Sequence, residues 1–450
     1  MTGWPLQFLM DSCPGEAKSL DPSVVFQRVC SDTRKIESGD LFIALRGDNF
    51  NGNKFAVQAI ENGAVAVVID EPVDGLPALL VQDVRKAYGQ LAAAHRKQFD
   101  LPVFAVAGSN GKTSCKEMLA SILREQFYAL HNEASFNNDV GVPATLLRLT
   151  SRHESAVLEV GTNHPGELAP LISMVSPKYG ILTGIGREHL EFFGDLEGVA
   201  KEEGMLAELL PGRGKLFLYG DGGWVKSITQ RSSPSYVTVG FDPGNDWQIS
   251  EVQIEEGLTR FMLDAPMNQF KGEYCTPLLG RHQAANASLA IAAASELELS
   301  REIILDGLSK CPQPRQRLQW AQRQGVSWLN DAYNANADSV NVALETLAQM
   351  PCAGRRYAVL GDMAELGEHT ESAHREVGVK ASGAVSGLVA VGQWAEITAE
   401  AARKKGLEKV EVVAGAKEAV ELLRDWLMPG DVVLLKASRA SKLEQIEELF

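Results

Sequence analysis

The stretch Val103–Ser114 constrains the fold of this chain more than any other part of the sequence. It begins with an apolar run typical of a buried strand, continues through a loop with Gly108 and Gly111, and leads into a helical pattern. Backbone N–H groups of such a loop surround a phosphate, a lysine such as Lys112 adds positive charge, and a hydroxyl such as that of Thr113 ligates Mg²⁺. The order of strand, loop, Lys-Thr pair and helix therefore predicts a phosphate-binding loop.

The loop is shorter than the usual phosphate-binding pattern. That pattern has a glycine five positions before the glycine of the Gly-Lys pair, where this chain has Val106. The alternative interpretation is an ordinary strand–turn–helix corner. We expect nucleotide phosphates to contact Ala107, Gly108, Ser109, Asn110, Gly111, Lys112 and Thr113.

Strand and helix patterns alternate along most of the 450 residues, which is enough chain for several domains. We predict an α/β protein with three domains: a small N-terminal α/β domain (1–98), a central domain with a P-loop-type, doubly wound sheet (99–313), and a C-terminal Rossmann-like domain (314–450). A linker with two prolines, Cys311–Pro314, separates the last two. The strands expected across these domains include Leu41–Leu45, Ala64–Ile69, Ala156–Val160, Tyr179–Thr183, Tyr357–Leu360, Leu388–Val391 and Val432–Leu435.

Charge and composition argue against several classes of protein. A net charge of −15 without a cluster of basic residues predicts no nucleic-acid partner. No unbroken apolar run is long enough to cross a bilayer, so we expect no membrane insertion. Residues 1–10 lack a basic region followed by an apolar core, so no secretory signal is expected. The six cysteines form no Cys-x-x-Cys pair, which favours reduced thiols in a cytoplasmic protein. Separately, we expect the protein to be a monomer.

Two polar residues follow expected strands of the central domain. Glu159 lies at the end of one strand, and His189 lies just beyond the end of the next. Ligands bind at the carboxyl ends of strands in parallel sheets, so both side chains are expected on the edge that carries the phosphate loop. The alternative for His189 is a packed or helix-capping histidine.

Several longer segments together resemble the Mur ligase family, and the resemblance covers essentially the whole chain. Within the family, the chain is most similar to the members that add D-alanyl-D-alanine to UDP-N-acetylmuramoyl-tripeptide. The segments that carry the resemblance most specifically are Asn137–Pro143, Asn163–Glu167, Tyr333–Asn336 and Gly361–Gly367.

The resemblance implies an ATP-dependent ligase of peptidoglycan synthesis. In the implied reaction the tripeptide carboxylate attacks the γ-phosphate of ATP to give an acyl phosphate, and the amine of D-alanyl-D-alanine then displaces phosphate. The third residue of the tripeptide is either diaminopimelate or lysine. The alternative functions are another amide ligase of the folylpolyglutamate synthase type and a non-catalytic ATP-binding switch.

The resemblance also implies two Mg²⁺ ions at the phosphates. Thr113 and Glu159 match the ligands of one ion, whereas His189 and a carbamoylated Lys201 match those of the second. Lys112, Glu159, His189 and Lys201 are therefore the expected catalytic residues. The local sequence alone indicates that Lys201 is a solvent-exposed lysine on a helix. Only its alignment with the family motif favours a carbamate.

The other ligand contacts follow from the same resemblance. His282 and Asn286 match positions at the adenine, Asp331 matches the contact to the ribose, and Arg317 matches an arginine that reaches toward the phosphates. Asp331 could instead cap a turn, and Asn286 could face solvent.

The expected substrate contacts are spread over the whole chain. They are Ser31, Asp32, Thr33, Arg34, Arg46 and Gly47 for the UDP-sugar, Asn137, Asn138 and Asn163 for the muropeptide, and Asn334, Asn336 and Arg439 for the dipeptide. Helix capping is the alternative role for Ser31 and Asp32. For Arg439 the alternative is a surface arginine that binds no carboxylate.

Overall fold

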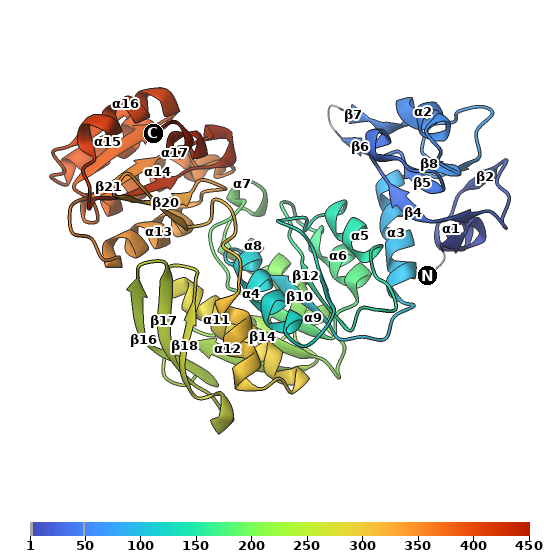
Figure 1. Cartoon of the computed structure of the whole chain (residues 1–450), viewed down its shortest axis with the longest axis horizontal. Coiled ribbons are helices and arrows are strands. Elements are labelled where there is room, and N and C mark those ends of the chain that lie inside the picture. The colour runs from blue at the N-terminus through green and yellow to red at the C-terminus, as the bar shows by residue number, and fades with distance from the viewer. Residues whose placement is uncertain (1–2, 48–49) are drawn as a thin grey trace. The chain divides into compact units, whose positions relative to one another are not determined.

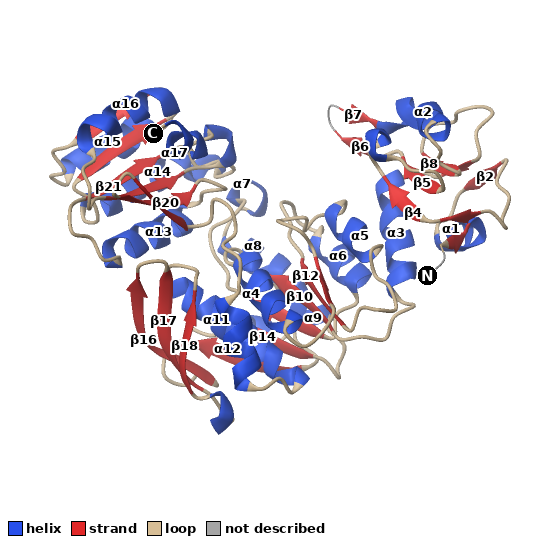
Figure 2. Cartoon of the chain, in the orientation of Figure 1, coloured by secondary structure: helices blue, strands red, loops and turns tan. Residues whose placement is uncertain are grey.

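The computed structural model describes residues 3–47 and 50–450, so residues 1–2 of the stretch inspected for a signal peptide lie outside it. The described chain is an α/β protein, as predicted (Figures 1 and 2). It divides into two compact units. The first unit contains residues 1–105, 127–161 and 169–178, and the second contains residues 106–126, 162–168 and 179–450. The predicted domain boundaries at residues 98 and 313 stay predictions.

The N-terminal part of the first unit is built on a sheet with the order β2-β9-β8-β5-β4, in which only β2 is antiparallel to its neighbour. Leu41 and Ile43 of β5 pack with α1 and α3, whereas Phe42 packs on the opposite face with α2. This alternation is what a strand buried on both faces requires. The elements are β1 (Trp4–Pro5), α1 (Leu6–Ser12), β2 (Glu16–Lys18), β3 (Val25–Phe26), β4 (Arg28–Cys30), β5 (Asp40–Ile43), β6 (Arg46–Gly47), β7 (Phe50–Asn51), α2 (Ala56–Glu61), β8 (Ala66–Ile69), β9 (Ala78–Leu80) and α3 (Val84–Arg96).

The central sheet has the order β11-β12-β10-β13-β14-β15-β16-β17-β18. From β13 to β16 the strands are parallel, and β17 and β18 then pair antiparallel. The Ala-rich helix α11 is buried along nearly its whole length because its small side chains let neighbouring elements approach closely. The elements are β10 (Val103–Ala107), α4 (Lys112–Arg124), β11 (Ala129–His131), α5 (Gly141–Leu146), β12 (Ser155–Glu159), α6 (Leu168–Val175), β13 (Tyr179–Leu182), α7 (Leu190–Phe193), α8 (Leu196–Glu203), α9 (Met205–Leu209), β14 (Lys215–Tyr219), α10 (Val225–Thr229), β15 (Ser235–Gly240), β16 (Trp247–Glu255), β17 (Leu258–Asp264), β18 (Gly272–Thr276), α11 (Arg281–Ala294) and α12 (Arg301–Ser309).

The C-terminal sheet has the order β19-β20-β24-β21-β22-β23, and only β19 is antiparallel. Ala358 and Leu360 of β21 pack in the core formed with α13, α14 and α15, whereas Tyr357 and Val359 face the core formed with α16 and α17. Helices thus cover both faces of this sheet, as predicted for a Rossmann-like domain. The elements are β19 (Gln319–Arg323), β20 (Val326–Asp331), α13 (Ala337–Gln349), β21 (Arg356–Leu360), α14 (Thr370–Ser382), β22 (Gly387–Val391), α15 (Ala395–Lys404), β23 (Val410–Val413), α16 (Ala416–Trp426), β24 (Val432–Lys436) and α17 (Glu444–Leu449).

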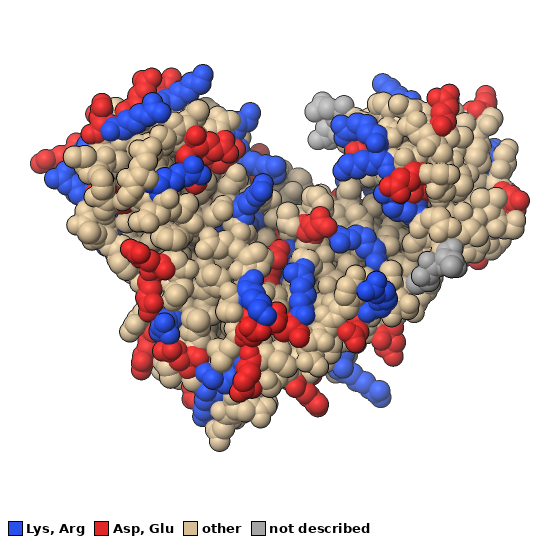
Figure 3. All heavy atoms as spheres, viewed as in Figure 1, with Lys and Arg blue, Asp and Glu red and all other residues tan. Residues whose placement is uncertain are grey.

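On the face drawn in Figure 3, Lys and Arg side chains are interspersed with Asp and Glu. All six cysteines lie in the described ranges and are free thiols. Within residues 3–47 and 50–450, no helix combines the length and the apolar character that a bilayer crossing needs.

Candidate active site

The phosphate loop adopts the conformation that its glycines predict. It follows β10 and ends where α4 begins at Lys112. Gly108 and Gly111 have φ values of +117° and +88°, which L side chains rarely adopt. A Cβ atom on Gly111 would lie 2.5 Å from Oδ1 of Asn286, so a larger residue is also excluded by space. Both positions therefore require glycine.

The segment that follows β13 holds the loop in place. The Thr183 hydroxyl donates to the Asn110 carbonyl at 2.6 Å, and the Ser109 N–H donates to the Gly184 carbonyl at 2.9 Å. The Gly186 N–H in turn donates to Oγ of Ser109 at 2.8 Å. The protein itself thus orders the loop, which reduces the entropy that a bound phosphate would have to remove.

Lys112 folds back over the loop. Its Nζ donates to the carbonyls of Gly108 and Ser109, at 3.3 Å for Ser109, and lies 3.3 Å from Oε2 of Glu188. Its side chain is 13% exposed. Thr113, in the first turn of α4, is buried. The positive charge and the hydroxyl are therefore both at the loop, as predicted.

Two acidic side chains that the sequence analysis did not identify lie at the same loop. Oε2 of Glu203 accepts the Gly108 N–H at 2.6 Å, and the Glu203 side chain is near that of Glu188. The second carboxylate oxygen of each residue, Oε1, is buried without a hydrogen-bond partner. Burial raises the pKa of Glu203 to about 8, with the Lys112 charge acting against this shift and the Glu188 charge adding to it.

The register of α8 explains why Glu203 faces the loop and Lys201 does not. Asp195 caps this helix by accepting the Gly198 N–H at 2.9 Å. Val199 and Glu203 are four residues apart on one buried face, whereas Lys201 is exposed. Across residues 3–47 and 50–450 the Lys201 ammonium has no ion pair and no hydrogen bond to the loop.

His189 has a strained backbone and a carboxylate partner. Its φ is +48°, in the left-handed region that few non-glycine residues adopt. Its Nδ1 pairs with the Glu365 carboxylate, and its side chain is 15% exposed. The structure therefore shows His189 paired with an acid, and its role as a metal ligand stays a prediction.

Glu159, in the first unit, ends β12 as predicted. Its side chain is buried, and Oε1 accepts from Nδ2 of Asn137 at 2.7 Å. The Asn132 side chain binds both the N–H and the carbonyl of Glu159, at 2.9 Å each. Oδ1 of Asn138 accepts the N–H of Gly141, the first residue of α5, at 2.9 Å. Two of the expected site residues, Glu159 and Asn137, are thus in direct contact.

Comparison with known proteins decides the family. Residues 26–96 match the description "Mur ligase family, catalytic domain", residues 106–294 match "Mur ligase middle domain", and residues 316–439 match "Mur ligase, glutamate ligase domain". The UDP-N-acetylmuramoyl-tripeptide–D-alanyl-D-alanine ligase of Escherichia coli (strain K12) is 35% identical, with 98% of this chain and 97% of that protein covered. The chain belongs to the Mur ligase family. The ligase of the same name from Bacillus subtilis (strain 168) is 33% identical, with 94% and 92% covered.

A solved structure extends the likeness to three dimensions. A crystal structure of MurF from Acinetobacter baumannii has a TM-score of 0.91 and 31% identity, with 99% of this chain and 98% of that chain covered. The resemblance inferred from the sequence is thereby confirmed.

The residues expected at the adenine of this Mur ligase lie at the start of α11. Nδ1 of His282 is buried without a hydrogen-bond partner, and burial lowers the pKa of His282 to about 4, with the Lys436 charge adding to the shift. Asn286 is buried and donates to Oε1 of Gln283 at 3.0 Å, so it does not face solvent. Neutral His282 thus keeps an unused polar atom at this position.

The residues expected near the ribose and phosphates form an ion-pair cluster after β20. Asp331 accepts the Leu318 N–H at 3.0 Å and pairs with Nζ of Lys436 at 2.7 Å. Lys436 also donates to the Asn334 carbonyl at 2.6 Å. The Arg317 guanidinium lies 4.3 Å from the centre of the Tyr333 ring. Lys436, the last residue of β24, thus ties Asp331 to the segment that contains Asn334.

Asp32 and Arg34, in the polar loop expected at the UDP-sugar, pair with each other. Asp32 caps the turn Thr33–Lys35 and accepts from the Arg34 side chain at 2.8 and 2.9 Å, as in the helix-capping alternative. Arg46 pairs with Glu71. Ser31 is half-buried, and Gly47 is exposed in the strand β6. Their role in UDP binding stays a prediction.

An arginine that the sequence analysis missed links two groups of expected substrate residues in the first unit. Nε of Arg85 donates to the Arg46 carbonyl at 2.9 Å, and its Nη1 binds both carboxylate oxygens of Asp139 at 2.8 and 2.9 Å. Asp139 follows Asn138 in the chain. Arg85 therefore connects the loop expected at the UDP-sugar with the loop expected at the muropeptide.

The remaining residues that were expected to contact substrate differ in exposure and in hydrogen-bond partners. Asn163 is exposed, and its N–H donates to the Glu167 carboxylate at 2.9 Å. Asn336 caps α13 and donates from Nδ2 to Oδ1 of Asn110 at 3.4 Å, so it reaches the phosphate loop. Arg439 is exposed, as in the surface-arginine alternative.

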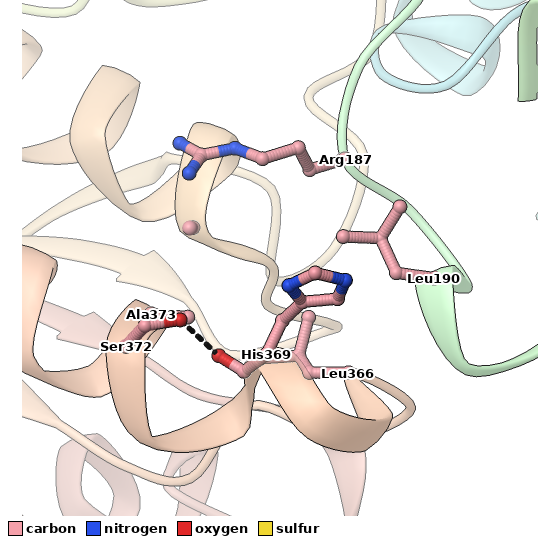
Figure 4. Close-up of a pocket in the computed structure, with 7 residues that line it drawn as sticks. Arg187, Leu190, Leu366, His369, Ser372 and Ala373 are labelled. Atoms are coloured by element: carbon pink, nitrogen blue, oxygen red, sulfur yellow. Dashed lines mark hydrogen bonds between the residues drawn. The ribbon is translucent and has the colours of Figure 1, made fainter. Parts of the chain in front are cut away.

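A small pocket is lined by chain neighbours of His189 and Asn336 (Figure 4). The His369 ring lies beside the Leu190 side chain, and Arg187 extends along the same space. Arg187 is held by Asp338 and by two hydrogen bonds to Glu376, at 2.7 and 2.9 Å. No residue of the phosphate loop lines this pocket, which is therefore not the phosphate site. Its lining residues are Arg187, Leu190, Ala337, Leu366, His369, Ser372 and Ala373.

Proposed function

We propose that this chain is an ATP-dependent ligase that joins D-alanyl-D-alanine to the terminal carboxylate of UDP-N-acetylmuramoyl-tripeptide. The observation that carries the proposal is a phosphate loop with Lys112 folded over it, in a chain 35% identical over 98% of its length to a ligase of that name. The substrate carboxylate attacks the γ-phosphorus and ADP leaves, and the dipeptide amine then attacks the acyl carbonyl and phosphate leaves. The product is UDP-N-acetylmuramoyl-pentapeptide.

The residues of the loop bind and neutralise the phosphates. Phosphoryl transfer depends mainly on positioning and on charge stabilisation, which an ordered loop and a lysine supply. Thr113 and Glu159 would hold one Mg²⁺ and His189 would contribute to a second, since oxygen ligands such as the buried Glu159 carboxylate suit this ion. When bound, Mg²⁺ neutralises charge on the transferring phosphate.

The carbamoylated Lys201 stays a prediction from the resemblance. Its exposed side chain gives that prediction no support.

The other contacts are proposed as the sequence predicted them. His282 and Asn286 bind the adenine, and the orphaned Nδ1 of His282 supports a polar contact there. Asp331 binds the ribose and Arg317 reaches toward the phosphates. The free thiols support a cytoplasmic location, and a monomer is expected.

A substrate-omission assay tests the proposed function. The protein is incubated with ATP, Mg²⁺, UDP-N-acetylmuramoyl-tripeptide and D-alanyl-D-alanine, and phosphate release and the nucleotide-linked peptide are measured while one component at a time is left out. We expect full turnover only with all components. The product should be heavier than UDP-N-acetylmuramoyl-tripeptide by the mass of D-alanyl-D-alanine less one water. Running both tripeptides, with diaminopimelate or lysine as third residue, assigns the preferred substrate.

Two outcomes would reject the proposal. Phosphate release that ignores the dipeptide but requires glutamate and a folate would favour a ligase of the folylpolyglutamate synthase type. Nucleotide binding without phosphate release in any mixture would favour an ATP-binding switch.

A further inference from the structure

Glu188 and Glu203 are buried acids at the phosphate loop to which the proposed reaction assigns no role. Glu188 is 6% exposed and Glu203 is 1% exposed. Oε2 of Glu203 accepts the Gly108 N–H, and Oε2 of Glu188 lies 3.3 Å from Nζ of Lys112. Each keeps its Oε1 buried and without a partner. Acids so deeply buried are rare unless something pairs with them.

Two neighbouring carboxylates such as those of Glu188 and Glu203 are stabilised by a positively charged partner. Both carboxylates contact the same loop: Glu203 accepts the Gly108 N–H, and Glu188 pairs with Lys112, which also contacts the Gly108 carbonyl. Two carboxylates held at one loop repel each other, and a cation between them relieves the repulsion. Lys112 provides one positive charge, but it contacts Oε2 of Glu188, and both Oε1 atoms stay without a hydrogen-bond partner.

We propose that Glu188 and Glu203 hold a divalent cation beside the phosphate loop. Mg²⁺ is commonly bound by one or two carboxylates together with substrate phosphates and water, so two acids suffice when a nucleotide supplies further oxygens. Within residues 3–47 and 50–450 no group of three or more His, Cys, Asp or Glu residues could hold a metal ion, so the two acids need oxygens from the nucleotide to complete the site. The inference rests on the proposed function, because ATP completes the site.

The inference changes which residue supplies the negative charge near the phosphates. A carbamate would turn Lys201 into an anion only after reaction with CO₂. Glu203 needs no such modification, lies on the same helix, and faces the loop. An encoded carboxylate thus does the work for which the resemblance assigned a modified lysine.

Mn²⁺ binding tests the site directly. Free Mn²⁺ is measured by electron paramagnetic resonance while the full chain is titrated in the presence of a non-hydrolysable ATP analogue. We expect Glu203→Gln and Glu188→Gln each to weaken Mn²⁺ binding by at least about 10-fold, the size of effect seen when groups around a bound metal are altered. Glu197→Gln, which changes an exposed acid on the same helix, is the matched control and should leave the affinity within about 2-fold.

Binding of the analogue without metal and thermal unfolding are measured on the same proteins. Both Gln variants should still unfold cooperatively, because glutamine keeps the size of glutamate and a side-chain oxygen that can accept the same hydrogen bond. If the parent binds no nucleotide, the proposed function fails. If the parent binds nucleotide and Mn²⁺ but both folded Gln variants keep its Mn²⁺ affinity, the cation site is overturned while the proposed function stands.

Discussion

Lys201 and Glu203 lie two residues apart on α8 in opposite surroundings. Lys201 is exposed, whereas Glu203 is 1% exposed and hydrogen-bonded to the phosphate loop. If Glu203 supplies the negative charge in place of a carbamate, as inferred above, we expect the protein under ¹³CO₂ to show no carbamate signal by ¹³C NMR, and turnover to be the same in buffer stripped of bicarbonate. A carbamate resonance that disappears in Lys201→Ala would contradict this and restore the modified lysine.

Lys112 is the side chain on which turnover should depend most. Its Nζ lies at the carbonyls of Gly108 and Ser109, where the phosphates of ATP are expected. Removal of one group that stabilises transition-state charge typically costs about 10²–10³-fold in kcat. We expect Lys112→Ala to lower kcat by about that factor with an unchanged far-ultraviolet circular dichroism spectrum. Lys226→Ala, at an exposed position of α10, is the control, and near-normal turnover by Lys112→Ala would refute the assigned role.

Among the secondary-structure elements, α14 is joined to the loop after β21 through a buried histidine. Nδ1 of His374 lies 2.8 Å from the Thr370 carbonyl, and Nε2 accepts the Met363 N–H at 3.1 Å. This pattern requires neutral imidazole, and burial lowers the pKa of His374. The unfolded chain, with an ordinary histidine pKa near 6.5, therefore takes up the proton first as the pH falls. Stability contributed by this histidine is fully present above that pH and is lost below it.

The expected outcome is a loss of stability between pH 7.5 and pH 5 that depends partly on His374. The urea midpoint is measured at both pH values for the parent and for His374→Gln, which does not titrate. The change in urea midpoint between pH 7.5 and pH 5 should be smaller in the variant than in the parent. The variant should also be less stable at pH 7.5 by about 1–3 kcal/mol, because the buried Met363 N–H loses its acceptor. An equal difference in both proteins would show that other groups cause the pH dependence.

The sequence predicted elements better than it predicted side-chain partners. Strands such as Leu388–Val391 were found because both faces of a parallel strand are buried and the apolar run is continuous. The phosphate loop was found because its glycines and Lys112 have a strict local order. Glu203 was missed because the inward face of α8 depends on what packs against it, which local sequence does not determine. Asp32 shows the converse, since its local capping role is visible and any ligand contact is not.

For the molecule as a whole, the reaction requires groups from both compact units. The residues expected at the UDP-sugar, such as Arg46, belong to the first unit, whereas the phosphate loop with Lys112 belongs to the second. The tripeptide carboxylate must reach the γ-phosphate, so a complex with both ligands requires one particular arrangement of the units. The free protein has no such requirement and can change the arrangement of its units. We expect small-angle X-ray scattering to show a smaller radius of gyration with UDP-N-acetylmuramoyl-tripeptide and a non-hydrolysable ATP analogue together than with either alone. Lys112→Ala, which weakens the hold on the phosphates, should reduce this change at equal ligand concentration, and superimposable curves for free and doubly liganded parent protein would count against a ligand-driven rearrangement.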